Sequence, residues 1–332
     1  MSIANPYLHD PDQRGTHERG NRLKRMAAVA SISVAVILIL TKFFAYLWTG
    51  SVSLLSSLVD STIDSLASII TFFSVTRAME PPDKAHRYGH GKLEALSAMA
   101  QAAFIVGSAV FLFFEAMQRI ARPRMIENAE FGYAVMVLSI VLTLALVIFQ
   151  KYVIKKTGSI AITGDHWHYQ GDLLMNAGVI LAMFLSVYTG FLYFDPIFAL
   201  IIVVILLHAA KEVGTEAYDI LMDRELPDED RKKLEKIIMT HPQARAVHDL
   251  RTRNTGQQIF IECHLELDGD MTLEMAHHIT EEIEIMVYAA YPKAEVMIHQ
   301  EPAGIADDRL DKRVEDASAG DPNAKDTSGK ET

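Results

Sequence analysis

The sequence predicts an α-helical membrane protein with six transmembrane helices, followed by a small cytoplasmic α+β domain. Two observations predict this fold. Six apolar stretches are each about long enough to cross a hydrocarbon core of roughly 30 Å. After about Lys211 the composition changes to that of a soluble domain.

The first apolar segment, 26–50, carries Lys42 as its only charge. We expect this side chain to extend toward the outer interface, with no role in transport. The polar residues before the segment, and the length of the segment itself, argue against a cleavable signal peptide. The other five membrane helices are expected at 52–76, 93–118, 130–151, 160–188 and 192–210.

Basic residues indicate the orientation, because Lys and Arg concentrate in short cytoplasmic loops. They precede the first helix, flank the loop between the second and third helices, and follow the fourth. Arg119, Arg122 and Arg124 run against this pattern, since they fall in a loop that it puts outside. The first and fifth loops carry almost no basic residues, so we expect both termini in the cytoplasm.

The segment after the last membrane helix has a pattern typical of helix, strand, strand, helix and strand. From Ala303 the chain is rich in Asp, Lys, Gly, Ser and Ala without an apolar period, so no ordered structure is expected there. The expected domains are an N-terminal tail at 1–25, a transmembrane domain at 26–212, a cytoplasmic domain at 213–302 and a disordered tail at 303–332.

Two function classes receive no support from the composition. The chain lacks a GxxxxGK[ST] phosphate-binding loop, so ATP is not expected as the energy source. The formal net charge is -11, and the sequence shows no basic face that would bind nucleic acid.

Two polar pairs lie where a membrane helix normally excludes charge. Asp60 and Asp64 in the second segment, and His168 and Asp172 in the fifth, are each spaced i,i+4, so each pair shares one helix face. An unpaired carboxylate there costs about 3 kcal/mol. A bound divalent metal would offset that cost, and three carboxylates with one imidazole suit zinc. The alternative is polar packing between helices.

The loop before the third helix reads PPDKAHRYGHGKLEALSAM. Its Asp83, His86 and His90 are spaced so that one cation could be held by a short turn and the start of the next helix. Solvated histidines in a basic loop are the alternative explanation.

A third group of candidate ligands lies in the cytoplasmic domain: His248, His264, His277 and His299, with Glu301. Strand side chains alternate, so His299 and Glu301 share a face, whereas Cys263 and His264 face opposite sides. The only cysteine, Cys263, is therefore expected to be a small buried residue rather than a ligand. Surface histidines are the alternative here.

Together these residues resemble the cation diffusion facilitator family. The resemblance rests on the segments GSVSLLSSLVDSTIDSLAS, HRYGHGKLEALSAMAQ, HYQGDLLMN, VHDLRTRNTGQQIFIECHLELDG, AHHITEEIE and VMIHQEP, which span about 20–302. It implies a homodimer in the bacterial inner membrane whose cytoplasmic domain has a metallochaperone-like fold and helps to hold the dimer.

The resemblance also implies roles for the candidate residues. The two intramembrane pairs would form one transport site that faces alternately inward and outward, and the loop residues a second site near the cytoplasmic surface. The cytoplasmic histidines would bind two metals. The family has Asp where this chain has Glu301, so bridging of two metals is left open. Lys92 and Asp223 would form a charged pair that interlocks the protomers.

The expected function is efflux of zinc in exchange for protons, with cadmium or ferrous iron as further substrates, by a secondary transporter and not an enzyme. Metal ligands bind in their deprotonated form, which couples metal to protons. Two alternatives are a membrane-embedded metalloenzyme and a metal sensor or scaffold that transports nothing.

Overall fold

The computed structural model describes residues 11–49, 52–121, 130–191, 193–304 and 309–320. The chain divides into two compact units. One comprises residues 18–221, and the other comprises the described residues from 222 to 320. We describe each unit by itself.

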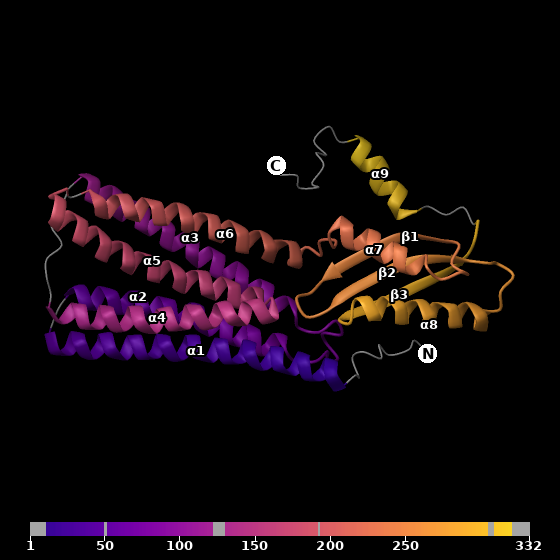
Figure 1. The fold of residues 1–332 in the computed structure, drawn as a ribbon, viewed down its shortest axis with the longest axis horizontal. Coiled ribbons are helices and arrows are strands. Elements are labelled where there is room, and N and C mark those ends of the chain that lie inside the picture. The colour runs from indigo at the N-terminus through magenta and orange to yellow at the C-terminus, as the bar shows by residue number, and fades with distance from the viewer. Residues whose placement is uncertain (1–10, 50–51, 122–129, 192, 305–308, 321–332) are drawn as a thin grey trace. The chain divides into compact units, whose positions relative to one another are not determined.

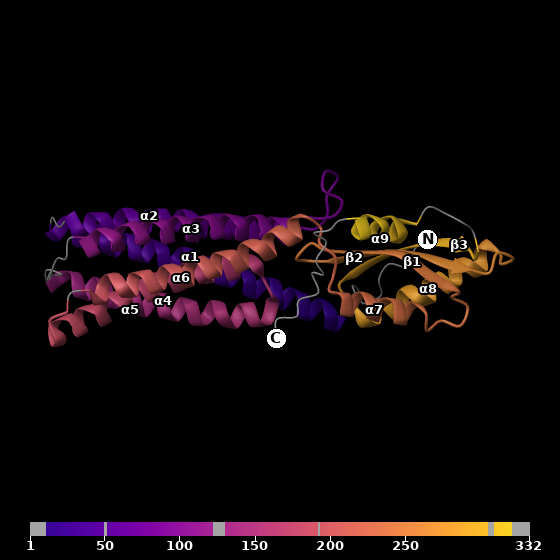
Figure 2. The ribbon, with the colours of Figure 1, turned by 90° about the horizontal axis from the view of Figure 1, so that it is seen from above.

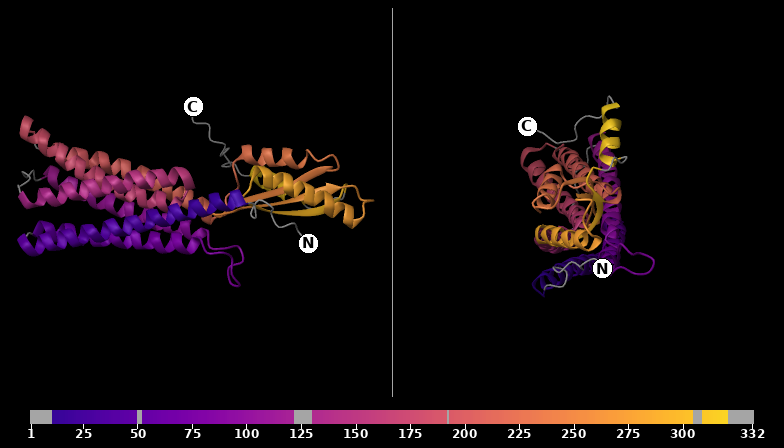
Figure 3. Two further views of the ribbon diagram at one scale, coloured as in Figure 1. Left: turned by 60° about the horizontal axis from the view of Figure 1, so that its bottom comes forward. Right: turned by 90° about the vertical axis from the view of Figure 1, so that its right-hand side faces the viewer.

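The first unit is a bundle of six long helices that run roughly along one direction (Figures 1 and 3). Their bounds are α1 Pro11–Thr49, α2 Val52–Ala78, α3 Lys92–Ala121, α4 Glu130–Thr157, α5 Ile160–Thr189 and α6 Phe194–Leu221. Within the part of the chain that the structure describes, a stretch that is apolar and long enough to cross a membrane is found in each of these helices except α5. Helix α5 is 30 residues long and carries Asp165, His166, His168 and Asp172. The predicted helical membrane domain is confirmed.

Two helix bounds differ from the sequence prediction by more than ten residues. Helix α1 begins at Pro11, well before the apolar segment, because the polar residues that follow Pro11 continue the same helix. Helix α6 continues to Leu221 through the polar stretch after Lys211, so the unit boundary lies after 221 rather than at 212. Hydropathy locates the part of a helix that lies in lipid, not the end of the helix.

Close packing holds α5 in the middle of the bundle, against α3, α4 and α6. A Cβ added at Gly164 would lie 2.8 Å from Cβ of Gln101 on α3, and one at Gly171 would lie 2.8 Å from Leu206 on α6. At Gly164 a larger residue would displace the neighbouring helix, and at Gly171 it would displace the side chain of Leu206. Helix α5 begins at the N-cap Ser159, whose hydroxyl accepts a hydrogen bond from the N–H of Ile162.

The second unit is an α+β domain, as predicted. It contains α7 Asp228–Ile238, β1 Ala246–Asn254, β2 Ile259–Leu267, α8 Leu273–Ala290 and β3 Ala294–Pro302. Strand β2 is central, antiparallel to β1 and parallel to β3. Helices α7 and α8 cover one face of the sheet, where Leu234, Ile238 and Ile283 pack on Ile261 and Leu265.

One further helix, α9 Leu310–Gly320, lies in the stretch where the sequence predicts no ordered structure. Figure 2 shows it on the opposite side of the sheet from α7 and α8. Hydrogen bonds to β1 hold the first residues of α9 in place. The apolar pattern within α9 is weak, so the sequence of this stretch alone does not predict the helix. The rest of the predicted tail, 305–308 and 321–332, lies outside the described residues.

Candidate metal centres

The structure brings three of the four intramembrane candidates together. Nε2 of His168 on α5 lies 3.1 Å from Oδ1 of Asp64 on α2. Asp64, His168 and Asp172 each offer a ligand atom within 4.8 Å of the others. His168 is buried, and the two carboxylates are partly buried. Two oxygens and one imidazole nitrogen at this separation can converge on one metal ion.

Asp60 belongs to the same site but is not within that inner group. It lines a cavity of about 150 Å³ that also includes Asp64 and Asp172. Asn176, one turn beyond Asp172, lines it as well. Asp60 can therefore complete the coordination shell from the cavity side.

A basic side chain, that of Lys42, also contributes to this cavity. It lines this cavity, and its ammonium group donates hydrogen bonds to the hydroxyl of Ser61 at 2.6 Å and to the carbonyl of Ser57 at 3.2 Å. The expectation that it extends toward the outer interface with no role in transport stays a prediction, but its place in the cavity was not expected. A single apolar segment gives no sign of this, because the direction of the side chain depends on how α1 packs on α2.

Asp165 is fully buried and acts as the centre of a polar network that sequence reasoning did not find. Its carboxylate accepts hydrogen bonds from Ser31 on α1 at 2.6 Å and from Gln150 on α4 at 2.7 Å. Ser68 on α2 and Gln101 on α3 donate at 3.5 and 3.4 Å. Asp165 is three residues before His168, so this network fixes the helix turn that presents the imidazole.

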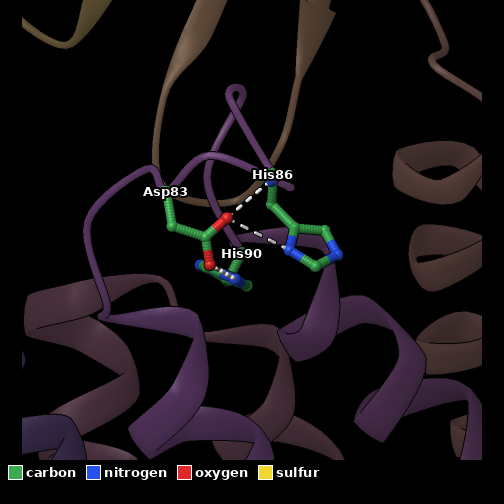
Figure 4. Close-up of side chains that lie close together, drawn as sticks. All are labelled: Asp83, His86 and His90. Carbon is green, nitrogen blue, oxygen red and sulfur yellow. Dashed lines mark hydrogen bonds and ion pairs between the residues drawn. The ribbon is translucent and has the colours of Figure 1, made fainter.

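The loop residues Asp83, His86 and His90 also converge (Figure 4). Oδ1 of Asp83 is 3.4 Å from Nδ1 of His86, and Oδ2 is 3.4 Å from Nε2 of His90. His90 is buried, and among the described residues neither of its ring nitrogens has a hydrogen-bond partner. Hydrogen bonds from the backbone N–H groups of His86 and Ala85 lower the pKa of Asp83, so the carboxylate stays ionised. A cation beside Asp83 could bind one ring nitrogen of His86 and one of His90.

In the second unit, three histidines form one row across the sheet. His248 on β1 is opposite His264 on β2, and His264 is opposite His299 on β3. Their neighbouring ring centroids are 5.2 and 4.9 Å apart. Glu301 reaches all three rings: its carboxylate oxygens lie 3.4 Å from His248, 2.7 Å from His264 and 3.5 Å from His299.

The other candidates of this unit lie apart from the row. His277 is paired with Glu281 one turn along α8, at 3.2 Å, so within one chain it is not part of the cluster. Cys263 is buried in the core, as predicted, and burial raises its pKa to about 12. Glu266, which sequence reasoning missed, lies 3.4 Å from Nδ1 of His248. The alternation of β2 places it on the same face as His264, and this could have revealed it.

The two residues of the expected protomer interlock fall in different units of the chain. Lys92 donates a hydrogen bond to the carbonyl of Leu221 at 3.4 Å, and Asp223 lies 3.9 Å from Arg253. Their pairing stays a prediction.

Two family models cover almost all of the described chain. A model of the cation efflux transmembrane domain matches residues 28–222, and one of the cation efflux protein cytoplasmic domain matches residues 226–303. The chain is 44% identical over 281 residues to the cation-efflux pump FieF of Shewanella oneidensis, covering 85% of this chain and 95% of that protein. It is 42% identical over 284 residues to FieF of Klebsiella pneumoniae, covering 86% and 94%.

A solved structure of CzrB in its Zn form is 34% identical, with a TM-score of 0.25, and covers 26% of this chain and 99% of the other. A cadmium form of the MamM CTD D249E is 26% identical, with a TM-score of 0.22, and covers 23% and 95%. Both TM-scores are too low to support a structural comparison. The two family models and the FieF relatives are sufficient: the chain belongs to the cation diffusion facilitator family and is a membrane transporter for the efflux of divalent cations, not an enzyme.

Proposed function

We propose that the chain exports zinc from the cytoplasm in exchange for protons, as a homodimer in the bacterial inner membrane with both termini inside. One observation carries this proposal: Asp64, His168 and Asp172 converge within 4.8 Å in a bundle of membrane helices. With Asp60 from the same cavity they offer three oxygens and one nitrogen, a set that suits a tetrahedral zinc ion. Cadmium and ferrous iron fit the same donors.

Proton exchange follows from the chemistry of these ligands. Carboxylates and imidazole bind metal in their deprotonated forms, so loading a metal releases protons, and protonation favours release of the metal. In alternating access, the same ligands then face each side of the membrane in turn.

The loop and cytoplasmic clusters are assigned to supporting roles. Asp83, His86 and His90 would hold a metal near the cytoplasmic surface. The row of His248, His264 and His299 with Glu301 would bind metal in the dimerisation domain, where His277 of the second copy could complete a second metal position. Lys92 and Asp223 would then pair between the protomers.

The test is zinc flux into proteoliposomes under an imposed pH gradient. The parent protein should move zinc at a rate that depends on the gradient, and Asp64→Ala or His168→Ala should abolish the flux. His208→Ala is the matched control, because His208 is exposed on α6 and in none of the described clusters. Flux that ignores the gradient would exclude proton exchange, and zinc binding without any flux would favour the sensor alternative.

A further inference from the structure

Lys42 is the one basic residue in the apolar part of α1, and it points at the transport cavity. A lysine in a membrane helix normally extends its ammonium group to the interface, because burial without partners is costly. Here the side chain instead lines the cavity with Asp60, Asp64 and Asp172. Extension of the side chain to the interface does not explain why Lys42 lines this cavity.

The ammonium group is anchored. Ser61 accepts one of its hydrogen bonds at 2.6 Å, and the carbonyl oxygen of Ser57, one turn earlier on α2, accepts another at 3.2 Å. Ser61 is buried and directly follows Asp60 in the chain. Both acceptors lie on the helix that carries Asp60 and Asp64, so α2 fixes the positive charge beside its own two carboxylates.

The charge also acts on the carboxylates. Lys42 interacts electrostatically with Asp64, Asp172 and Asp60, the three acidic residues of the cavity. Three ionised carboxylates alone carry one more negative charge than a divalent ion can neutralise. With the ammonium group of Lys42 counted as the missing positive charge, the formal charge of the cavity with one divalent ion is zero. Neutrality matters here because an uncompensated charge is expensive in a low-dielectric bundle.

We propose that Lys42 is the resident counter-cation of the transport cavity, setting its preference for divalent ions and keeping metal affinity low enough for release. This inference rests on the proposed function, since it assigns the cavity to metal transport. The ammonium group repels the incoming cation, and it remains in place when the metal leaves. It therefore limits the accumulation of negative charge in the empty cavity.

The direct test is metal binding to purified protein in detergent, comparing Lys42→Met with the parent. Binding at the transport cavity is taken as the part lost in a companion Asp64→Ala protein, which removes the contribution of the other clusters. Removal of the positive charge should tighten zinc binding about tenfold or more. Terbium(III), followed by its luminescence, should gain more than zinc, because the repulsion scales with the charge of the ion.

Three further variants separate charge from packing. Lys42→Gln keeps a donor for Ser57 and Ser61 but loses the charge, and should behave like Lys42→Met. Lys42→Arg keeps the charge and should retain the parent affinity. Lys151→Met removes a lysine that is exposed on α4 and does not line the cavity. This variant should change the affinity for neither zinc nor terbium.

The outcomes are distinct. The proposal would be overturned if the zinc affinity of both neutral variants stayed within twofold of the parent. It would also be overturned if the affinities for zinc and terbium rose equally. If Lys42→Met does not fold, Lys42→Gln and Lys42→Arg still decide the question. Absence of zinc flux in the parent would instead overturn the proposed function, and the binding comparison does not depend on that result.

Discussion

Asp249 and Asp311 form reciprocal hydrogen bonds, in which the backbone N–H group of each residue donates to the carboxylate of the other. The N–H of Asp249 donates to Oδ2 of Asp311 at 2.6 Å, and the N–H of Asp311 donates to Oδ1 of Asp249 at 2.9 Å. The other carboxylate oxygen of Asp249 accepts from the N–H of Leu310, also at 2.9 Å. Asp249 lies where the β1–β2 register is interrupted and has a φ of 50°, so the irregularity turns its carboxylate toward the first turn of α9.

Replacing Asp249 by Ala should release α9 from the sheet. The start of the helix loses two hydrogen-bond acceptors, and loss of a helix cap costs about 1 kcal/mol. Hydrogen exchange of the amides in 310–320 should then accelerate several-fold, while exchange in β2 stays unchanged. Asp249→Asn is the control, since Asn keeps one oxygen acceptor and tolerates a positive φ. Equal exchange of 310–320 in the Ala variant and the parent would refute the docking role.

The same contact should weaken in acid. Burial alone would raise the pKa of Asp249, but hydrogen bonds from the backbone N–H groups of Asp311 and Leu310 lower it below its usual range. A lowered folded-state pKa stabilises the docked form above the ordinary aspartate pKa of about 3.9, and this stabilisation is lost as pH falls through the folded value. Exchange of 310–320 should thus rise below about pH 4 after correction for intrinsic rates. In Asp249→Asn this pH dependence should be reduced.

Lys24 and Glu94 form a buried ion pair between α1 and α3, with 2.7 Å between Nζ and Oε1. Glu94 also accepts a hydrogen bond from Ser159, the N-cap of α5. Glu94→Ala should destabilise the bundle by about 3–5 kcal/mol, because it leaves a buried ammonium group without its carboxylate. Thermal unfolding in detergent measures this. The double variant Lys24→Met, Glu94→Met should recover much of the loss, and a double variant no better than Glu94→Ala would contradict the account.

We expect replacement of Asp165 to lower the stability of the helix bundle, ahead of any effect on metal binding. Asp165→Ala removes the acceptor of the hydrogen bonds from Ser31 and Gln150, at about 1 kcal/mol for each bond, although Ser31 can still donate to the carbonyl of Ala27 and Gln150 to Ser31. Asp165→Asn retains one carbonyl oxygen and should lose less. We expect both variants to lower the unfolding temperature in detergent, Ala more than Asn. An Ala variant as stable as the parent would mean that the network does not hold the bundle together.

Cys263 should be unreactive in the folded protein. The reactive form is the thiolate, and burial raises the pKa of this thiol to about 12. Iodoacetamide at pH 8 should leave the native protein unmodified and label it fully in denaturant, as mass spectrometry can follow. Because this is the only cysteine in the chain, labelling reports opening of the second unit alone. Native labelling at the rate of a free thiol would show that the core is open.

Local spacing explains what the sequence could predict. Long apolar runs predict membrane helices, and i,i+4 spacing puts Asp60 beside Asp64 and His168 beside Asp172 without any knowledge of packing. Strand alternation likewise separates Cys263 from His264, and the structure has one in the core and the other in the row.

Features that depend on packing between distant segments were not predictable. The acceptors of Lys42 lie on the next helix, and the donors to Asp165 come from four other helices. Helix α9 depends on Asp249, some sixty residues earlier in the chain. In each case the role of the residue depends on contacts with a second segment of the chain. The sequence around the residue does not indicate those contacts.

The row of His248, His264 and His299 has a consequence for the assembly of the sheet. Each histidine comes from a different strand, and a slip of one residue in either pairing would turn one imidazole to the opposite face. Only the correctly aligned sheet can gather all three around Glu301. Metal binding by the three histidines would therefore stabilise the sheet with the correct strand alignment and no sheet with a shifted register. The rest of the domain depends on that alignment.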